Sequence, residues 1–236
     1  MELKILKNIL WSEFAEFAGT LELENVTDRN IDNKVMEFFR HSIEKKGIKI
    51  NFSEPINDIY RFEAGRTPYD LLIFGKIYEK DFKIFLNNKL GDLESSARND
   101  VTTYNNLLRL YLGVRSQRLS GEIQIDRNLL LKRAVGDEII SYAMFILDKN
   151  TGDFNFFFLE EVADAFYVNP RNYMFQVKYR PALREKPLNY CEFILNLIEA
   201  TIRALRASIE KAEEEIGILK HLKEKIEGLG DTEKGN

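Results

Sequence analysis

Three polar residues in a strand–turn–strand pattern carry the chemistry that this sequence suggests. Asp70 opens an apolar run over 71–74, and a second apolar run over 82–86 leads to Asn87 and Lys89. The charged turn 79–81 joins the two runs as in a hairpin, and alternate residues of a strand share a face. We therefore expect a carboxylate, an amide oxygen and an ammonium at one end of a small sheet. Such a set can hold a divalent cation and stabilise negative charge that develops on a substrate.

The segment after this hairpin has a composition that suggests contact with nucleic acid. We expect a helix over 93–112, in which Arg, Asn, Thr and Tyr replace the usual exposed Lys and Glu. Arg and Asn can make paired hydrogen bonds to base edges, and Thr and Tyr can bind phosphates. The residues expected to face DNA, from this helix and the segment that follows it, are Arg98, Asn99, Asn105, Arg109, Arg115, Arg118, Lys132 and Arg133.

Charge is distributed unevenly along the chain. The formal net charge of −4 disfavours a protein that coats nucleic acid with its whole surface. Residues 98–133 nevertheless contain seven Lys or Arg against three Asp or Glu, and residues 171–186 contain five against one. An acidic protein with such confined basic segments fits an enzyme whose DNA-binding cleft alone is positive. Ordinary scatter of surface charge is the alternative interpretation.

The composition excludes several other kinds of chemistry. With 236 residues, 44% of them hydrophobic, the chain provides one globular domain with an appendage, or two small domains. A single Cys leaves no disulfide framework, and two isolated His disfavour Ser-His-Asp, Cys-His and His-metal sites. No apolar run approaches the ~18 residues of a membrane span. The N-terminus lacks the cleavage site of a signal peptide, so we expect a cytoplasmic protein without membrane contact.

The apolar pattern predicts the elements that position the hairpin. Helices are expected over 1–18 and 31–46, with Gly47 just past the end of the second. Further strands are expected over 48–52, 122–126, 139–147, 154–159 and 173–179. Together these elements predict an α/β domain over residues 1–187.

Residues 188–229 follow a different pattern. Apolar residues recur at steps of three and four from Ile194 to Ile226, with charged residues between them. The pattern predicts one long amphipathic helix, or two that are separated near Gly217, because glycine weakens a helix interior by about 1 kcal/mol. The near-heptad spacing favours dimerisation with a second copy of the chain, and packing against its own domain is the alternative. Residues 230–236 form a polar tail for which no order is expected.

The hairpin residues resemble the motif of the PD-(D/E)XK nuclease superfamily, which includes type II restriction endonucleases, Holliday-junction resolvases and repair nucleases. The resemblance covers roughly residues 31–126. Asp70 follows Pro68 and Tyr69, one residue more than the family's Pro-Asp, and Asn87 precedes Lys89 by two positions. Asn87 stands where the family usually has Asp or Glu. This exchange removes a negative charge and lowers the expected affinity for a hard cation.

The resemblance implies an α/β restriction-endonuclease-like fold, with a mixed central sheet flanked by helices. It also implies Mg²⁺-dependent cleavage of double-stranded DNA by a homodimer whose two-fold symmetry matches a palindromic site. It assigns Asp70 and Asn87 to the metal, and Lys89 to the attacking water and the phosphate charge. A glutamate from the preceding helix or loop would complete the site, and the candidates are Glu37 and Glu44 in the predicted helix and Glu63 in the loop.

Three alternatives remain open. A non-catalytic DNA-binding or assembly protein on a degenerate nuclease fold is motivated by the amide at Asn87. A coiled-coil interaction protein would use the C-terminal helix as its functional part. In the simplest case Asp70 and Lys89 form an ordinary surface ion pair, which contributes less than about 1 kcal/mol.

Overall fold

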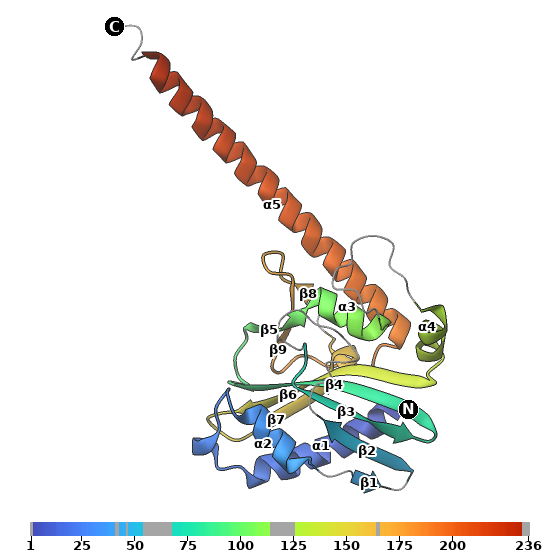
Figure 1. The fold of residues 1–236 in the computed structure, drawn as a ribbon. Coiled ribbons are helices and arrows are strands. Elements are labelled where there is room, and N and C mark those ends of the chain that lie inside the picture. Colours follow the sequence, from blue (N-terminus) through green and yellow to red (C-terminus); the bar gives the residue numbers. More distant parts are fainter. Residues whose placement is uncertain are drawn as a thin grey trace.

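A six-stranded mixed sheet forms the centre of the protein (Figure 1). The computed structural model describes residues 2–40, 43–45, 47–53, 68–113, 126–163 and 166–232, with side chains described up to residue 225. In spatial order the strands are β1 (Ile43–Lys45), β2 (Ile48–Ser53), β3 (Leu71–Ile77), β4 (Lys80–Gly91), β6 (Glu138–Asp148) and β7 (Phe154–Phe158). Neighbouring strands are antiparallel except for β4 and β6, which run parallel. The expected hairpin is therefore confirmed as β3 and β4.

Different layers cover the two faces of this sheet (Figure 1). On one face, α1 (Glu2–Thr20) and α2 (Ile31–Phe38) share a hydrophobic core with the sheet, and the short helix η1 (Leu23–Asn25) connects them. The other face carries α3 (Tyr104–Leu112), α4 (Arg127–Ala134), the first turns of α5 (Tyr190–Thr232) and a small second sheet. That sheet has the order β5-β9-β8, formed by β5 (Arg98–Thr103), β9 (Met174–Lys178) and β8 (Tyr167–Val168). The predicted mixed α/β fold is confirmed.

The central strands were predictable because they are apolar on both faces. Residues 140–148 of β6 are all buried, as are residues 84–88 of β4. Strands that are covered on both sides have near-continuous apolar sequences, and this pattern identified both segments. The strands predicted over 154–159 and 173–179 are also confirmed, as β7 and β9.

The predicted helix over 31–46 is wrong in its second half. The helix α2 ends at Phe38, and residues 43–45 form the edge strand β1, paired with β2. Gly47 therefore lies between two strands instead of capping a helix, with a φ of 77° that favours glycine. Its carbonyl accepts a hydrogen bond from the backbone N–H of Tyr78 in the β3–β4 turn. Pairing with β2 decided the structure of this segment, and local periodicity could not reveal it.

The predicted helix over 93–112 is also wrong in its first half. Residues 98–103 form β5, and only 104–112 are helical. Val101, Thr102 and Thr103 are β-branched and pair well in a strand, and the Thr103 hydroxyl then caps α3 by accepting a hydrogen bond from the N–H of Asn106. Of the strand predicted over 122–126, residues 122–125 lie outside the described residues. Asp126 caps the unpredicted helix α4.

The helix α5 is continuous and extends far beyond the rest of the protein (Figure 1). Its first turns pack on the domain through Phe193, Leu197, Ala200 and Ala204, all of which are buried. From Leu205 onward, almost all described side chains are exposed. Gly217 lies within the helix and does not interrupt it. Among the described residues, no helix is both long and apolar enough to cross a membrane.

A buried carboxyl group connects the central sheet to the layer that contains α3. Glu160 of the short helix η2 (Leu159–Glu161) accepts hydrogen bonds from the hydroxyls of Tyr111 (2.6 Å) and Ser141 (2.7 Å). Burial raises the pKa of Glu160 to about 7, and nearby Glu161 adds to this, while the two hydroxyl donors oppose it. The folded protein therefore keeps a proton on Glu160 that the unfolded chain releases near its ordinary pKa of 4.5.

This raised pKa predicts how stability depends on pH. Because the folded state binds more protons between about pH 4.5 and 7, the contribution of Glu160 to the free energy of unfolding falls as pH rises through this range, by at most about 1.4 kcal/mol per pH unit. Glu160→Gln is expected to flatten the dependence. Urea unfolding at several pH values measures it, and an equally steep profile in the variant would contradict the assignment.

Candidate active site

The carboxylate of Asp70 lies where the chain enters β3. The backbone N–H of Asp70 donates to the carbonyl of Leu86 (2.8 Å) and so extends the β3–β4 pairing by one residue. Asp70 Oδ2 accepts a hydrogen bond from the backbone N–H of Asn88 (2.7 Å). The two strands of the hairpin therefore fix this carboxylate at the end of β4 where Lys89 lies.

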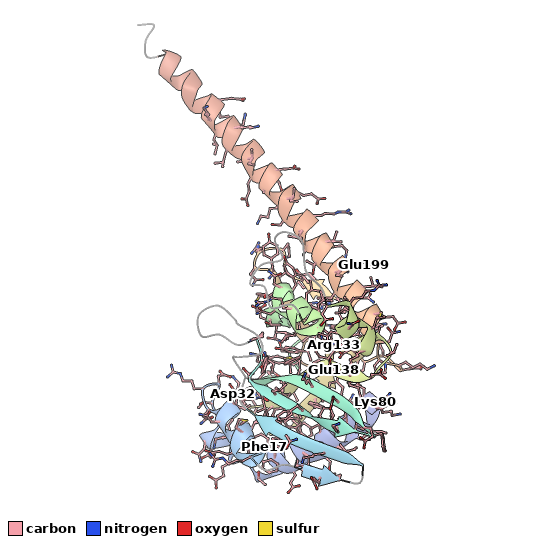
Figure 2. All side chains as sticks on the ribbon, turned by 45° about the vertical axis from the view of Figure 1, so that its right-hand side comes forward. Phe17, Asp32, Lys80, Arg133, Glu138 and Glu199 are labelled. Carbon is pink, nitrogen blue, oxygen red and sulfur yellow. The ribbon has the colours of Figure 1, made fainter. Side chains whose placement is uncertain are left out.

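A second carboxylate, which the sequence interpretation missed, comes from α2. Asp32 Oδ1 accepts a hydrogen bond from Nδ2 of Asn88 (3.0 Å). Asp32 lies near one end of β4, and Lys80 lies at the other (Figure 2). The available signal was its position one turn before Val35 and Met36, on the apolar side of the predicted helix. The resemblance pointed only to glutamates as the additional acid.

The two carboxylates and Lys89 interact electrostatically. Burial, followed by the charge of Asp32, raises the pKa of Asp70 to about 6, while the Asn88 N–H and the Lys89 ammonium oppose the rise. Burial also raises the pKa of Asp32 above its ordinary value, against the effects of Asn88 and Lys89. Two like charges in a partly buried position repel each other, and one ammonium only partly offsets this. A bound divalent cation would relieve the repulsion.

The neighbouring asparagines point to opposite faces of the sheet. The amide nitrogen of Asn87 donates to the carbonyl of Val101 (3.2 Å) and to the hydroxyl of Tyr142 (3.1 Å), in the layer that contains α3. Asn88 points toward α2, as its contact with Asp32 shows. Within the part of the chain that the structure describes, Oδ1 of each asparagine is buried without a hydrogen-bond partner. Such oxygens are expected to bind water or a cation, because leaving them unpaired is unfavourable.

The donor set fits a hard divalent cation through oxygen atoms. In the described ranges, no group of three or more His, Cys, Asp and Glu side chains lies close enough to hold a metal. Near the end of β4 the protein instead offers two carboxylates, from Asp32 and Asp70, and two buried amide oxygens, from Asn87 and Asn88. Because the two amides point to opposite faces of the sheet, one cation can bind only one of them. Oxygen ligands of this kind suit Mg²⁺, which retains several waters and needs few protein ligands.

The structure separates one predicted metal ligand from this cluster and leaves another undescribed. In the strand register, Glu44 of β1 lies opposite Lys49 of β2, which lies opposite Lys76 of β3. Lys76 is six residues beyond Asp70, so Glu44 is roughly 20 Å from Asp70 along the strand direction. Glu44 is exposed and contacts only the Lys49 ammonium, at 3.6 Å, among the ion pairs of the described residues. The structure therefore does not bring Glu44 to this cluster, because residues 43–45 form an edge strand and not a helix. Glu63 lies outside the described residues.

Part of the predicted DNA-facing set lies on the same side of the molecule as this cluster. Arg98 and Asn99 belong to β5, and Val101 of the same strand contacts Asn87. The guanidinium of Arg98 lies over the ring of Tyr167, 5.2 Å from its centre. Asn105 is partly buried in the first turn of α3.

The remaining predicted DNA contacts are not supported by their positions. Arg109 and Arg133 are buried, so neither can face a duplex. Arg133 donates to Glu138 (2.9 Å) and to the carbonyls of Leu110 and Tyr111. Lys132 is exposed on α4 beside the start of β6, at the end of the sheet opposite Lys89. Arg115 and Arg118 lie outside the described residues.

Comparison with known proteins identifies the family. No protein-family model matches the chain. The chain is 47% identical over 236 residues to the type II restriction enzyme MjaIV of Methanocaldococcus jannaschii, an alignment that covers 99% of this chain and 96% of the relative. Identity at this level over the full length of both proteins indicates common ancestry and a common fold. The chain therefore belongs to the type II restriction enzymes, which are endonucleases.

Proposed function

We propose that this protein is a Mg²⁺-dependent type II restriction endonuclease that hydrolyses phosphodiester bonds of double-stranded DNA at the cluster around Asp70. The observation that carries the proposal is the fixed position of the Asp70 carboxylate at the end of β4, with Asp32 and Lys89 close enough to shift its pKa. Membership of the restriction enzymes supports the same activity.

The residues divide the chemistry between them. Asp32 and Asp70 would hold Mg²⁺, with the amide oxygen of Asn87 or Asn88 as a further ligand. When bound, Mg²⁺ lowers the pKa of a coordinated water and polarises the scissile phosphate. The Lys89 ammonium orients the attacking water and stabilises negative charge on the phosphate oxygens in the transition state. Asn88 positions both acids, because its backbone N–H binds Asp70 and its side chain binds Asp32.

We also propose that the site is a variant of the PD-(D/E)XK arrangement. Asp70 corresponds to the first acid, Asn87 to the variable position and Lys89 to the lysine. The nitrogen of Asn87 is used within the protein by Val101 and Tyr142, which leaves its oxygen for the metal. Asp32 supplies a second carboxylate from α2, on the face of the sheet opposite to the Asn87 side chain, so the region around Asp70 retains two negative charges.

The protein is further proposed to act as a homodimer, because cleavage of both strands of a palindromic site is achieved most simply by two copies related by a two-fold axis. The alternative of a non-catalytic DNA-binding protein rests on Asn87 alone. The second carboxylate at Asp32 weakens that argument, and family membership favours the enzyme over a pure interaction protein.

Incubation of plasmid and phage DNA with the protein tests the proposal. We expect discrete fragments with Mg²⁺ and no cleavage when EDTA removes the metal. Calorimetric titration of the protein with DNA, in the presence of Ca²⁺, measures binding separately. Binding without cleavage in Mg²⁺ or Mn²⁺ would favour the non-catalytic alternative, and fragments of random length would contradict a site-specific enzyme.

A further inference from the structure

The distal part of α5 carries an exposed apolar stripe, which we call the α5 seam. Its members are Ile202, Leu205, Ile209, Ala212, Ile216 and Leu219. They follow one another at alternating steps of three and four residues, which is the a and d pattern of a heptad. All six are exposed, and Ile209, Ile216 and Leu219 are 58%, 51% and 64% exposed. A stripe of this length in water indicates that a partner covers it.

The seam is distinct from the surface that α5 uses within its own domain. Phe193, Leu197 and Ala204 are buried against the domain, whereas Ile198 and Ile202, on the seam side of the same turns, are exposed. At 100° per residue, the centres of the two surfaces lie roughly 120° apart around the helix. The sequence left two alternatives for this helix, dimerisation and packing against its own domain, and they apply to different faces. One face packs on the domain, and the other lacks a partner within the described residues.

The side chains of the seam indicate what covers it. The a positions are the β-branched Ile202, Ile209 and Ile216, and the d positions include Leu205 and Leu219. Isoleucine at the a positions and leucine at the d positions favour a parallel coiled coil of two helices. One flanking charge pair agrees, because in a parallel pair Glu215 of one helix faces Lys220 of the other. The two Lys223 side chains meet at an a position beyond Leu219 and oppose the pairing there. A copy of the same helix is therefore a complementary partner.

We propose that α5 pairs along this seam with α5 of a second copy, as a parallel two-stranded coiled coil that joins two restriction-enzyme protomers. Both catalytic domains then lie at the same end of the rod, where two active sites can face one duplex. This step rests on the proposed function. Because the domain lies roughly 120° from the seam around the helix, the two domains fall on opposite sides of the rod and do not compete for space.

An antiparallel pair is the competing arrangement. It would place Glu199 opposite Lys220, and Arg206 opposite Glu213, and would avoid a Lys223 pair at an a position. These charges are at the surface, where each ion pair contributes less than about 1 kcal/mol. However, an overlap over 195–226 would hold the two catalytic domains at opposite ends of a rod about 45 Å long. The parallel pair is the one compatible with joint action on a short palindrome.

Sedimentation of the full-length protein and a matched pair of variants tests the seam. Ile216→Glu is expected to weaken the dimer at least about 100-fold, because two like charges would meet in one core layer. Ile218→Glu makes the same substitution two residues away, at a position that is 56% exposed and faces away from the seam. It should leave the dissociation constant within about threefold of the wild type. A monomeric wild type, or an undisturbed Ile216→Glu dimer, would overturn the proposal.

Cross-linking tests the orientation. Cys191 is exposed, so the variants are made in a Cys191→Ser background. In a parallel pair, Leu219→Cys places two thiols in the same layer and should give a disulfide-linked dimer under mild oxidation. In the antiparallel pair the same positions lie about 25 Å apart. Glu214→Cys, on the outer side, is the control and should remain unlinked. The parallel arrangement would be overturned if Ile216→Glu dissociates the dimer but Leu219→Cys gives no disulfide-linked dimer.

The outcomes separate this inference from the function on which it rests. A dimer that responds to the variants as expected but does not cut DNA would support pairing through the α5 seam and contradict the proposed endonuclease activity. A wild-type monomer that cleaves DNA specifically with Mg²⁺ would support the endonuclease activity and contradict pairing through the α5 seam.

Discussion

Asp70→Asn is expected to lower the rate of DNA cleavage at least about 100-fold, with little change in folding. The variant retains the size and the acceptor oxygen that bind the Asn88 N–H, but it would lose the charge that Asp70 is proposed to offer to Mg²⁺. Losses of two to three orders of magnitude are typical when one group that stabilises transition-state charge is removed. Single-turnover cleavage of plasmid DNA measures the effect, and circular dichroism verifies the fold.

Glu44→Gln is the matched control for this experiment. It removes one carboxylate from the same sheet, at an exposed position that β1–β2–β3 pairing places roughly 20 Å from Asp70. We expect cleavage at close to the wild-type rate. Equal loss of activity in both variants would show that general charge, and not the cluster at Asp70, controls the reaction. An active Asp70→Asn enzyme would remove Asp70 from the proposed site.

Arg133→Met is expected to destabilise the protein by about 3 kcal/mol without changing DNA affinity per folded molecule. The substitution removes a buried guanidinium that binds Glu138 and two backbone carbonyls at the end of α3. Loss of one partner from a buried ion pair typically costs 3–5 kcal/mol, and Lys83 still contacts Glu138 at 3.0 Å, so the lower part of this range applies. Urea unfolding measures the change.

The neighbouring Lys132→Met provides the comparison. Lys132 is exposed, so its replacement should change stability by less than about 0.5 kcal/mol. DNA affinity of both variants is measured below the unfolding transition. If Arg133→Met weakened DNA binding and left stability intact, the original assignment of Arg133 as a DNA contact would be restored and the structural role rejected.

The hairpin and the central strands were predictable because their signals are local. An apolar run, a short charged turn and a second apolar run specify β3 and β4 without reference to the rest of the chain. The nearly continuous apolar sequences of β4 and β6 also indicate strands that are covered on both faces. In contrast, β1 and β5 contain few apolar residues and become strands because β2 and β9 pair with them.

The candidate site was only partly predictable for the same reason. Asp70 and Lys89 lie on adjacent strands of one hairpin, so their proximity follows from local pairing. Asp32 lies 38 positions before Asp70 in the sequence and reaches the site only because α2 packs on the sheet at that end. Basic residues gave the least reliable signal, since composition does not distinguish a surface arginine from a buried one that binds an acid, as Arg133 does.

Local sequence patterns were enough to predict the α/β class, the hairpin that carries Asp70 and Lys89, and the long C-terminal helix. Each of these follows from a periodicity of two or 3.6 residues and from short turns, which neighbouring residues specify. Long-range packing brings Asp32 close to Asp70, keeps Glu44 away from it and buries Arg109 and Arg133. It also separated the buried and exposed faces of α5. These outcomes depend on which surfaces pack together, and packing brings together residues that lie far apart in the chain.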